Sequence, residues 1–212
     1  MCYLIIETLV LGPCMTNCYI VSFDEKNCIV IDPSDNANRI YNKINALSLN
    51  VCAILLTHGH FDHIMALKEL CDLFRQPDFP VYIHKSERFF LSDPQFNLSG
   101  SLFGEYFTFS GNIIEINHGD TLSFPGMSFN VIHTPGHTPG SVCYMIENVI
   151  FTGDTLFAST IGRTDFPGGD YPTILNSLKK LKALPDDYTL YPGHNASTTL
   201  SREKTYNEYL QI

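Results

Sequence analysis

Positive charge and tryptophan are both scarce in this 212-residue chain. It has no tryptophan, and its 13 lysines and arginines stand against 22 aspartates and glutamates, which gives a formal net charge of −9 at pH 7. A nucleic-acid-binding protein needs a basic surface to neutralise phosphates. The charge balance therefore counts against a nuclease and against any nucleic-acid partner.

Long apolar runs are also absent. No segment has the roughly 20 consecutive apolar residues of a transmembrane helix. The apolar residues 2–12 include Glu7 and lack a basic leader, so we interpret them as a strand and not as a signal peptide. The sequence predicts a cytoplasmic protein without a membrane partner.

The cysteines show no pairing pattern. Their number is odd, and no two have Cys-x-x-Cys spacing, which indicates buried thiols in a reducing compartment and not a disulfide framework. The seven are Cys2, Cys14, Cys18, Cys28, Cys52, Cys71 and Cys143.

Apolar residues make up 44% and charged residues 17% of the chain, as in globular proteins. The length suits one sizeable core, so we expect residues 1–212 to form a single domain. β-branched and aromatic runs between turn residues predict strands, and apolar residues three or four apart predict helices. The predicted strands are Tyr3–Val10, Cys18–Phe23, Cys28–Ile31, Val51–Leu56, Val81–Ile83, Ile113–Ile116, Thr121–Phe124, Met127–His133, Ser141–Ile146, Val149–Thr152 and Tyr188–Tyr191. The predicted helices are Asn36–Leu47, His63–Phe74, Tyr171–Leu184 and Ser201–Leu210.

Strands outnumber helices, and the helices lie near both ends of the chain. Two sheets packed face to face with helices outside would bury such a pattern. Residues 85–111 form an irregular stretch rich in aromatics. This aromatic stretch is either a wall or lid over a site, or plain packing or a subunit interface.

Four apolar strands end in a turn that carries histidine or aspartate. If these strands are neighbours, their ends converge on one spot of a rigid sheet, where sites are usually built. The segments are Leu55-Leu56-Thr57-His58, Val131-Ile132-His133-Thr134-Pro135-Gly136-His137, Ile150-Phe151-Thr152-Gly153-Asp154 and Leu190-Tyr191-Pro192-Gly193-His194.

The cluster between His58 and His63 predicts a centre for two metal ions. Histidine and carboxylate bind zinc and similar ions, and four such residues within six positions are too many for one ion with an open position. Asp154 can bridge two ions roughly 3.5–4 Å apart. The first predicted set is His58, His60, His137 and Asp154, and the second is Asp62, His63, His194 and Asp154.

Other titratable residues lack the spacing of this cluster. His84, His118 and His133 are expected to be ordinary core or surface histidines, with His133 as an alternative supporting partner of a ligand. Asp32 ends a strand, and it either supports the site or forms a structural turn.

The motifs resemble those of the metallo-β-lactamase superfamily. The His-x-His-x-Asp-His signature, Thr134–Ser141, Phe151–Phe157 and Pro192-Gly193-His194 occur in the family's order from about residue 17 to residue 194. The resemblance implies an α/β fold, an αββα sandwich of two mixed β-sheets flanked by helices, with the metals at one edge of the sheets. It implies two divalent metal ions, zinc first, with iron or manganese as alternatives.

Within that superfamily the chain looks most like the glyoxalase II-like, or hydroxyacylglutathione hydrolase-like, group. Residues 161–170, Ile-Gly-Arg-Thr-Asp-Phe-Pro-Gly-Gly-Asp, are similar to a segment of its short bacterial members, and a related segment occurs in persulfide dioxygenases. Glyoxalase II has an added C-terminal helical domain that helps to hold glutathione, whereas this chain stops soon after His194. Glutathione recognition is therefore an open point.

The predicted function is hydrolysis of a thioester such as S-lactoylglutathione by a hydroxide held between two ions. A metal lowers the pKa of bound water to about 7, and a leaving thiolate, with a thiol pKa of about 8.5, needs no general acid. Asp154 and Asp62 are the catalytic candidates, Asp62 as a proton shuttle. Arg163 either holds a substrate carboxylate or pairs with Asp165.

Several competing functions share these residues. A persulfide dioxygenase would use one iron on the first set, and a lactone or another ester would suit the same hydrolytic centre. A non-enzymatic role is disfavoured because every expected ligand is present, and β-lactam hydrolysis because no export signal is seen. The expected partner is a small-molecule substrate, and the chain is expected to be a monomer or a homodimer.

Overall fold

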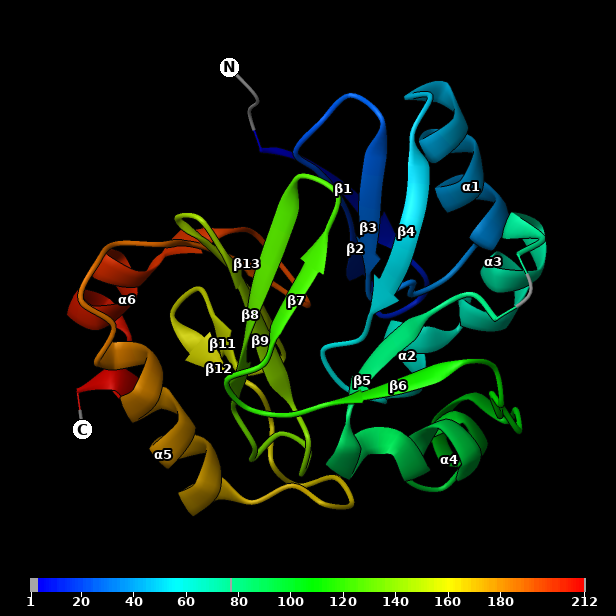
Figure 1. The fold of residues 1–212 in the computed structure, drawn as a ribbon. Coiled ribbons are helices and arrows are strands. Elements are labelled where there is room, and N and C mark those ends of the chain that lie inside the picture. Colours follow the sequence, from blue (N-terminus) through cyan, green and yellow to red (C-terminus); the bar gives the residue numbers. More distant parts are fainter. Residues whose placement is uncertain (1–3, 77, 212) are drawn as a thin grey trace.

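Two six-stranded β-sheets form the centre of the protein (Figure 1). The computed structural model describes residues 4–76 and 78–211. The first predicted strand, Tyr3–Val10, thus begins outside the described residues, as does Cys2.

The first sheet comes from the first half of the chain, in the order β1-β2-β3-β4-β5-β6. Its first three strands pair antiparallel, and β3 to β6 run parallel, so the sheet is mixed. The strands are β1 (Ile5–Leu11), β2 (Thr16–Ser22), β3 (Asn27–Ile31), β4 (Asn50–Leu55), β5 (Val81–His84) and β6 (Ile113–Ile116).

The second sheet has the order β14-β13-β10-β9-β8-β7 and is mixed as well. β10 and β13 pair parallel, and its other neighbours pair antiparallel. The strands are β7 (Thr121–Phe124), β8 (Met127–His133), β9 (Val142–Ile146), β10 (Val149–Gly153), β13 (Thr189–Pro192) and β14 (Thr198–Thr199), and β11 (Leu156–Phe157) pairs with β12 (Thr160–Ile161) apart from both sheets.

Helices cover the outer face of each sheet (Figure 1). α1 (Ala37–Ala46), α2 (Phe61–Ile64) and α3 (Leu67–Phe74) lie on the first sheet, and α5 (Tyr171–Lys182) and α6 (Leu200–Tyr206) lie on the second. Three buried apolar clusters match these layers, one under each set of helices and one between the sheets. The predicted αββα sandwich is confirmed.

Two predicted helices are interrupted. His63–Phe74 is α2 followed by α3, and it begins at Phe61. The break follows from tertiary pairing, because the backbone N–H of Ala66 donates to the carbonyl of Pro33 at 3.1 Å. Ser201–Leu210 is α6 followed by the 3-10 turn η2 (Glu208–Leu210), because Asn207 is extended and caps the second piece.

The aromatic stretch has more regular structure than predicted. It contains the 3-10 helix η1 (Lys85–Ser92) and the helix α4 (Ser99–Phe103). α4 is only 5 residues long and ends at Gly104, whose φ of 69° lies in the left-handed region that favours glycine. Because α4 is so short, its sequence shows no helical periodicity from which the helix could be predicted. Within the residues that the structure describes, no helix is long and apolar enough to span a bilayer.

Phe129 tests how much the cluster between the sheets contributes to stability. Its ring is fully buried on β8. We expect Phe129→Ala to lower the free energy of unfolding by about 3–5 kcal/mol, because the variant loses apolar burial and leaves a cavity. Urea unfolding measures the loss. Ser128→Ala, at an exposed position of the same strand, is the control, and a loss below about 1 kcal/mol for Phe129→Ala would contradict the assignment.

Candidate functional site

The seven predicted metal-site residues lie together where strands of both sheets end. The segment after β4 enters α2, and the loops after β8, β10 and β13 approach it from the other sheet. The seven residues are His58, His60, Asp62 and His63 after β4, His137 after β8, Asp154 after β10 and His194 after β13.

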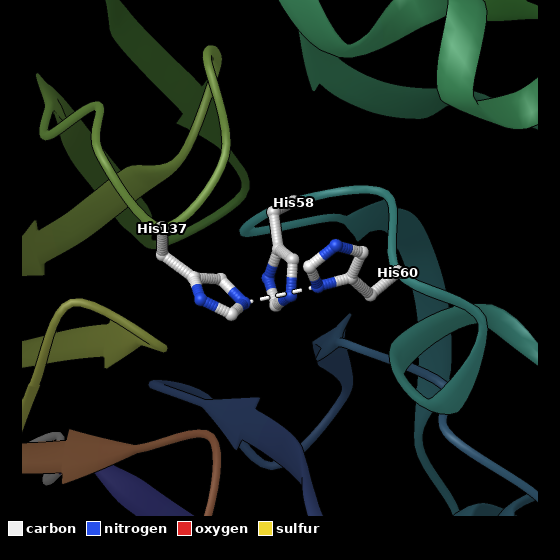
Figure 2. A group of neighbouring side chains, drawn as sticks. All are labelled: His58, His60 and His137. Carbon is white, nitrogen blue, oxygen red and sulfur yellow. Dashed lines mark hydrogen bonds between the residues drawn. The ribbon is translucent and has the colours of Figure 1, made fainter. Parts of the chain in front are cut away.

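His58, His60 and His137 form the first group. Figure 2 shows their three rings converging from two different loops. Their ligand atoms lie within 4.8 Å of one another, and all three side chains are buried. Nδ1 of His60 and Nε2 of His137 face each other at 2.9 Å. One cation could replace the proton between two such nitrogens.

Asp62, His63 and His194 form the second group, again within 4.8 Å. Nε2 of His194 lies 3.3 Å from Oδ2 of Asp62, and Nε2 of His63 lies 3.6 Å from the same oxygen. The fold thus brings together Asp62, His63 and His194, which the sequence analysis placed in the second predicted set.

Asp154 lies between the two groups. Its Oδ2 is 3.6 Å from Nε2 of His137 in the first group and 3.5 Å from Nε2 of His194 in the second. Its Oδ1 is 3.4 Å from Nε2 of His63. A carboxylate in this position can bridge two cations, as the sequence predicts.

Four histidines are held by the ring nitrogen that points away from the cluster. Nδ1–H of His137 donates to the carbonyl of Arg163 at 2.7 Å, and Nδ1–H of His194 donates to the carbonyl of Cys14 at 3.2 Å. Nδ1 of His63 contacts the Asp32 carboxylate, and Nδ1 of His58 contacts the Thr57 hydroxyl. Such outer hydrogen bonds orient metal-binding histidines, because they leave Nε2 to face the ion.

Unpartnered buried atoms support a metal at this place. Each such atom costs about 1–3 kcal/mol if nothing binds it. Cations would satisfy several of them at once, and imidazole nitrogen with carboxylate oxygen is a donor set typical of zinc and iron. The atoms are Nε2 of His58, His60 and His63, and Oδ1 of Asp154.

The histidines of the cluster differ in how readily they hold a proton. Burial lowers the pKa of His58, His60 and His137, which favours neutral rings. Burial also lowers the pKa of His194, but its hydrogen bonds to Asp154 and Asp62 outweigh burial and raise the pKa to about 9. Metal binding at neutral pH would therefore displace a proton from His194.

Asp32 supports the site, as one of its two sequence interpretations proposed. Its carboxylate accepts from the backbone N–H of Thr57 at 2.8 Å, from the Thr57 hydroxyl at 2.7 Å and from Nδ1 of His63 at 2.9 Å. Its φ of 50° lies in the left-handed region, but the structure has no turn at this residue. Thr16, which the sequence analysis missed, donates its hydroxyl to Oδ2 of Asp62 at 2.9 Å.

Glu87 was missed entirely. Its buried carboxylate accepts from the N–H of Gly59 at 3.0 Å and from the N–H of Gly140 at 2.7 Å. It thereby joins the His58–His63 segment to the loop that carries His137. Local sequence offers no signal for this role, because Glu87 stands between polar residues and its partners are distant in the chain.

Gly59 stands between His58 and His60 and lies against η1. Its φ is not in the left-handed region. A Cβ there would lie 2.4 Å from Cβ of Phe90, so the residue is small because η1 packs against it.

Arg163 forms an ion pair with Asp165, which was one of the two roles that the sequence suggested for it. Its guanidinium donates twice to Asp165, at 2.7 Å each, and lies 3.8 Å above the Phe166 ring.

His133 does not support a ligand among the described residues. It stacks on His84 with ring centroids 4.0 Å apart and contacts the Pro139 carbonyl.

An open cavity of about 430 Å³ adjoins the metal-site residues. His60, Asp62, His137, Asp154 and His194 line one side of it. Leu98, Leu102 and Phe103 line the same cavity, so part of the aromatic stretch forms a wall, as one interpretation proposed. Phe90 is instead fully buried and packs on the His60 ring.

Asp32→Asn tests the outer hydrogen bonds. An amide keeps the size but has one acceptor oxygen, so it cannot hold both Thr57 and the His63 ring as the carboxylate does. We expect metal affinity to fall about 10–100-fold, as measured by competition with a chromogenic chelator. Exposed Asp186→Asn is the matched control. Unchanged affinity in Asp32→Asn would show that the contact does not support metal binding.

Glu87→Gln tests the buried carboxyl. Burial raises the pKa of Glu87 to about 7, from 4.5. When a carboxyl group has a higher pKa in the folded state than in the unfolded state, the folded protein loses stability as pH rises from the lower pKa to the higher one. Relative to the variant, the wild-type protein should therefore lose about 3 kcal/mol of unfolding free energy between pH 4.5 and 8.

Urea unfolding at a series of pH values, with chelator present, measures this difference. Glu105→Gln, at an exposed position of the same stretch, should follow the wild type at every pH. Parallel curves for Glu87→Gln and wild type would contradict the prediction.

Comparisons with known proteins agree with this geometry. The Metallo-beta-lactamase superfamily model matches residues 11–194. Hydroxyacylglutathione hydrolase GloC of Haemophilus influenzae is 36% identical, and the match covers 97% of each chain. The BLEG-1 B3 metallo-beta-lactamase is 38% identical with a TM-score of 0.91, covering 98% of this chain and 100% of that one. TTHA1623 in a di-iron-bound form is 33% identical with a TM-score of 0.85, covering 96% of this chain and 100% of that one. The chain therefore belongs to the metallo-beta-lactamase superfamily.

Proposed function

We propose that the protein is a hydrolase of thioesters, with S-lactoylglutathione as a representative substrate and two divalent metal ions as cofactors. One observation carries the proposal: His137 and His194 are held from outside by backbone carbonyls, so that their Nε2 atoms face Asp154 beside an open cavity. The likeness to GloC supports a glutathione thioester.

Bound ions would supply a hydroxide at neutral pH and polarise the carbonyl that it attacks. The protein's own residues supply position and charge. Asp154 faces both groups, and its carboxylate stays ionised because nearby histidines outweigh burial and hold its pKa well below the usual range. Asp62 is ionised as well, since His63 and His194 outweigh burial and lower its pKa to about 2.

The state of these carboxyls favours a thioester over an amide. An amine leaving group needs a proton, whereas a thiolate, with a thiol pKa of about 8.5, leaves without one. Both carboxyls that line the cavity have lowered pKa values, so neither donates a proton at neutral pH. Oδ2 of Asp62 accepts a hydrogen bond from the Thr16 hydroxyl, and in this proposal it would accept a proton from attacking water.

Iron is a second candidate metal, because the similar structure of TTHA1623 is of a di-iron-bound form. A persulfide dioxygenase with one iron shares the first group and is the competing function. The likeness to BLEG-1 makes β-lactam hydrolysis a further competitor. The metal-to-protein ratio and the substrate decide among these functions.

Metal analysis of the purified protein and a substrate panel test the proposal. The panel holds S-lactoylglutathione, an acyl thioester, a lactone, a β-lactam and glutathione persulfide. We expect two ions per chain and the highest kcat/KM on a thioester. One iron per chain with oxygen uptake on the persulfide, or inert thioesters beside turnover of another class, would refute the assignment.

Asp154→Ala should lower thioester turnover more than about a hundredfold, because a lost ligand costs more than a lost outer partner. Metal content is measured on the same sample. The exposed Asp186→Ala is the control and should keep full activity. Wild-type turnover by Asp154→Ala would show that the reaction does not need a carboxylate between the two groups.

A further inference from the structure

The cavity beside the metal-site residues is also lined by several apolar side chains. Its volume of about 430 Å³ lies in the usual range for small-molecule sites. The apolar walls come from α4 with its preceding residue, from β11 and β12, and from the loop after β12. They are Leu98, Leu102, Phe103, Phe157, Ile161 and Phe166.

A second cavity, of about 450 Å³, continues from these walls. Both cavities are lined by Leu98, Leu102 and Phe166, so they adjoin along one surface. Tyr106 and Pro167 extend the second cavity away from the metal-site residues. Leu102 is 58% exposed and Tyr106 is 85% exposed, which leaves apolar surface open to a ligand. We call the two cavities together the apolar groove.

Charge is almost absent from the apolar groove beyond the metal-site end. Among the described residues that line it, Arg163 is the only lysine or arginine. Asp165 already neutralises that guanidinium through two hydrogen bonds, and Phe166 stacks beneath it. A substrate carboxylate would therefore enter the groove without a free cation to meet it, which is unfavourable.

We propose that the apolar groove binds an uncharged, apolar acyl chain of the substrate. This inference rests on the proposed thioester hydrolysis and names the acyl class. The carbonyl lies at the metal-site end near Asp154, and the chain extends past Leu102 toward Tyr106. A thioester has an acyl part and a thiol part. Because the common biological thiols are polar or charged, the acyl part is the one that suits apolar walls. A lactoyl group would leave the groove unfilled.

The reaction is hydrolysis and needs no other reactant. The C–S bond of the thioester breaks, and a C–O bond to the oxygen of water forms. The products are the fatty acid, ionised at neutral pH, and the free thiol. Of the two protons of water, one ends on the thiol and the other is released to solvent. No electrons are transferred.

A chain-length series tests the proposal. S-acyl-N-acetylcysteamine thioesters from acetyl to decanoyl carry no charge on either arm. We expect kcat/KM to rise about two- to fourfold for each added methylene until the groove is full, because each methylene leaves water. The 7-carboxyheptanoyl thioester is the matched charged substrate for octanoyl, and it should be turned over at least about tenfold more slowly.

Binding without turnover separates this proposal from the proposed function. The S-octyl and S-methyl thioethers of N-acetylcysteamine cannot be hydrolysed, and calorimetry measures their affinity for the protein as purified. We expect the octyl compound to bind more tightly. If every thioester is inert, thioester hydrolysis fails and the thioether comparison still decides the groove. If thioesters turn over without dependence on chain length and the two thioethers bind equally, only the groove proposal fails.

Leu102→Gln places a polar side chain of similar size at the shared wall. The ratio of kcat/KM for octanoyl over acetyl should fall at least about fivefold. Val10→Gln, an exposed apolar position on β1, is the control and should keep the wild-type ratio. An unchanged ratio in Leu102→Gln, with an altered oligomeric state, would assign this surface to subunit association and overturn the proposal.

Discussion

The Asp32 carboxylate joins the strand framework to the candidate metal centre. It lies directly after β3 and accepts two hydrogen bonds from Thr57, just after the neighbouring parallel strand β4, and a third contact from His63. Thr57 in turn touches the His58 ring. One buried anion thus sets the direction of one histidine in each group. Its burial is stable because every contact around it donates, which is the condition for keeping a carboxylate away from water.

Strand ends and Glu87 bring the remaining histidines into place. His137, Asp154 and His194 follow strands of the second sheet, so the site exists only when the two sheets pack. Glu87 reaches from η1 to both histidine loops and crosses that interface. Its raised pKa reflects the free energy spent on burial, and the two N–H donors offset part of it. The site therefore depends on contacts between distant segments and on few local ones.

This dependence explains what the sequence could predict. The fold followed from strand and helix periodicity together with the family motifs, and the cluster of site residues followed from strands that end in histidine or aspartate. Glu87 and Thr16 escaped because their partners lie 53 and 46 positions away at the farthest, and no local pattern marks such pairs. The helix break near Ala66 escaped for the same reason, because the carbonyl that causes it belongs to Pro33.

Reactivity and substrate choice come from different parts of the chain. The predicted metal-binding residues follow strands of both sheets, and buried hydrogen bonds hold several of them, so a change there would disturb the fold and the site together. The apolar groove is instead built from α4, the short β11–β12 pair and the loop that holds Phe166, and several of its side chains are exposed. Exposed positions tolerate substitution at little cost in stability. On the proposed function, the acyl group that the protein accepts could therefore change through Leu102 or Phe166 while Asp32, Glu87 and the histidines they position stay the same.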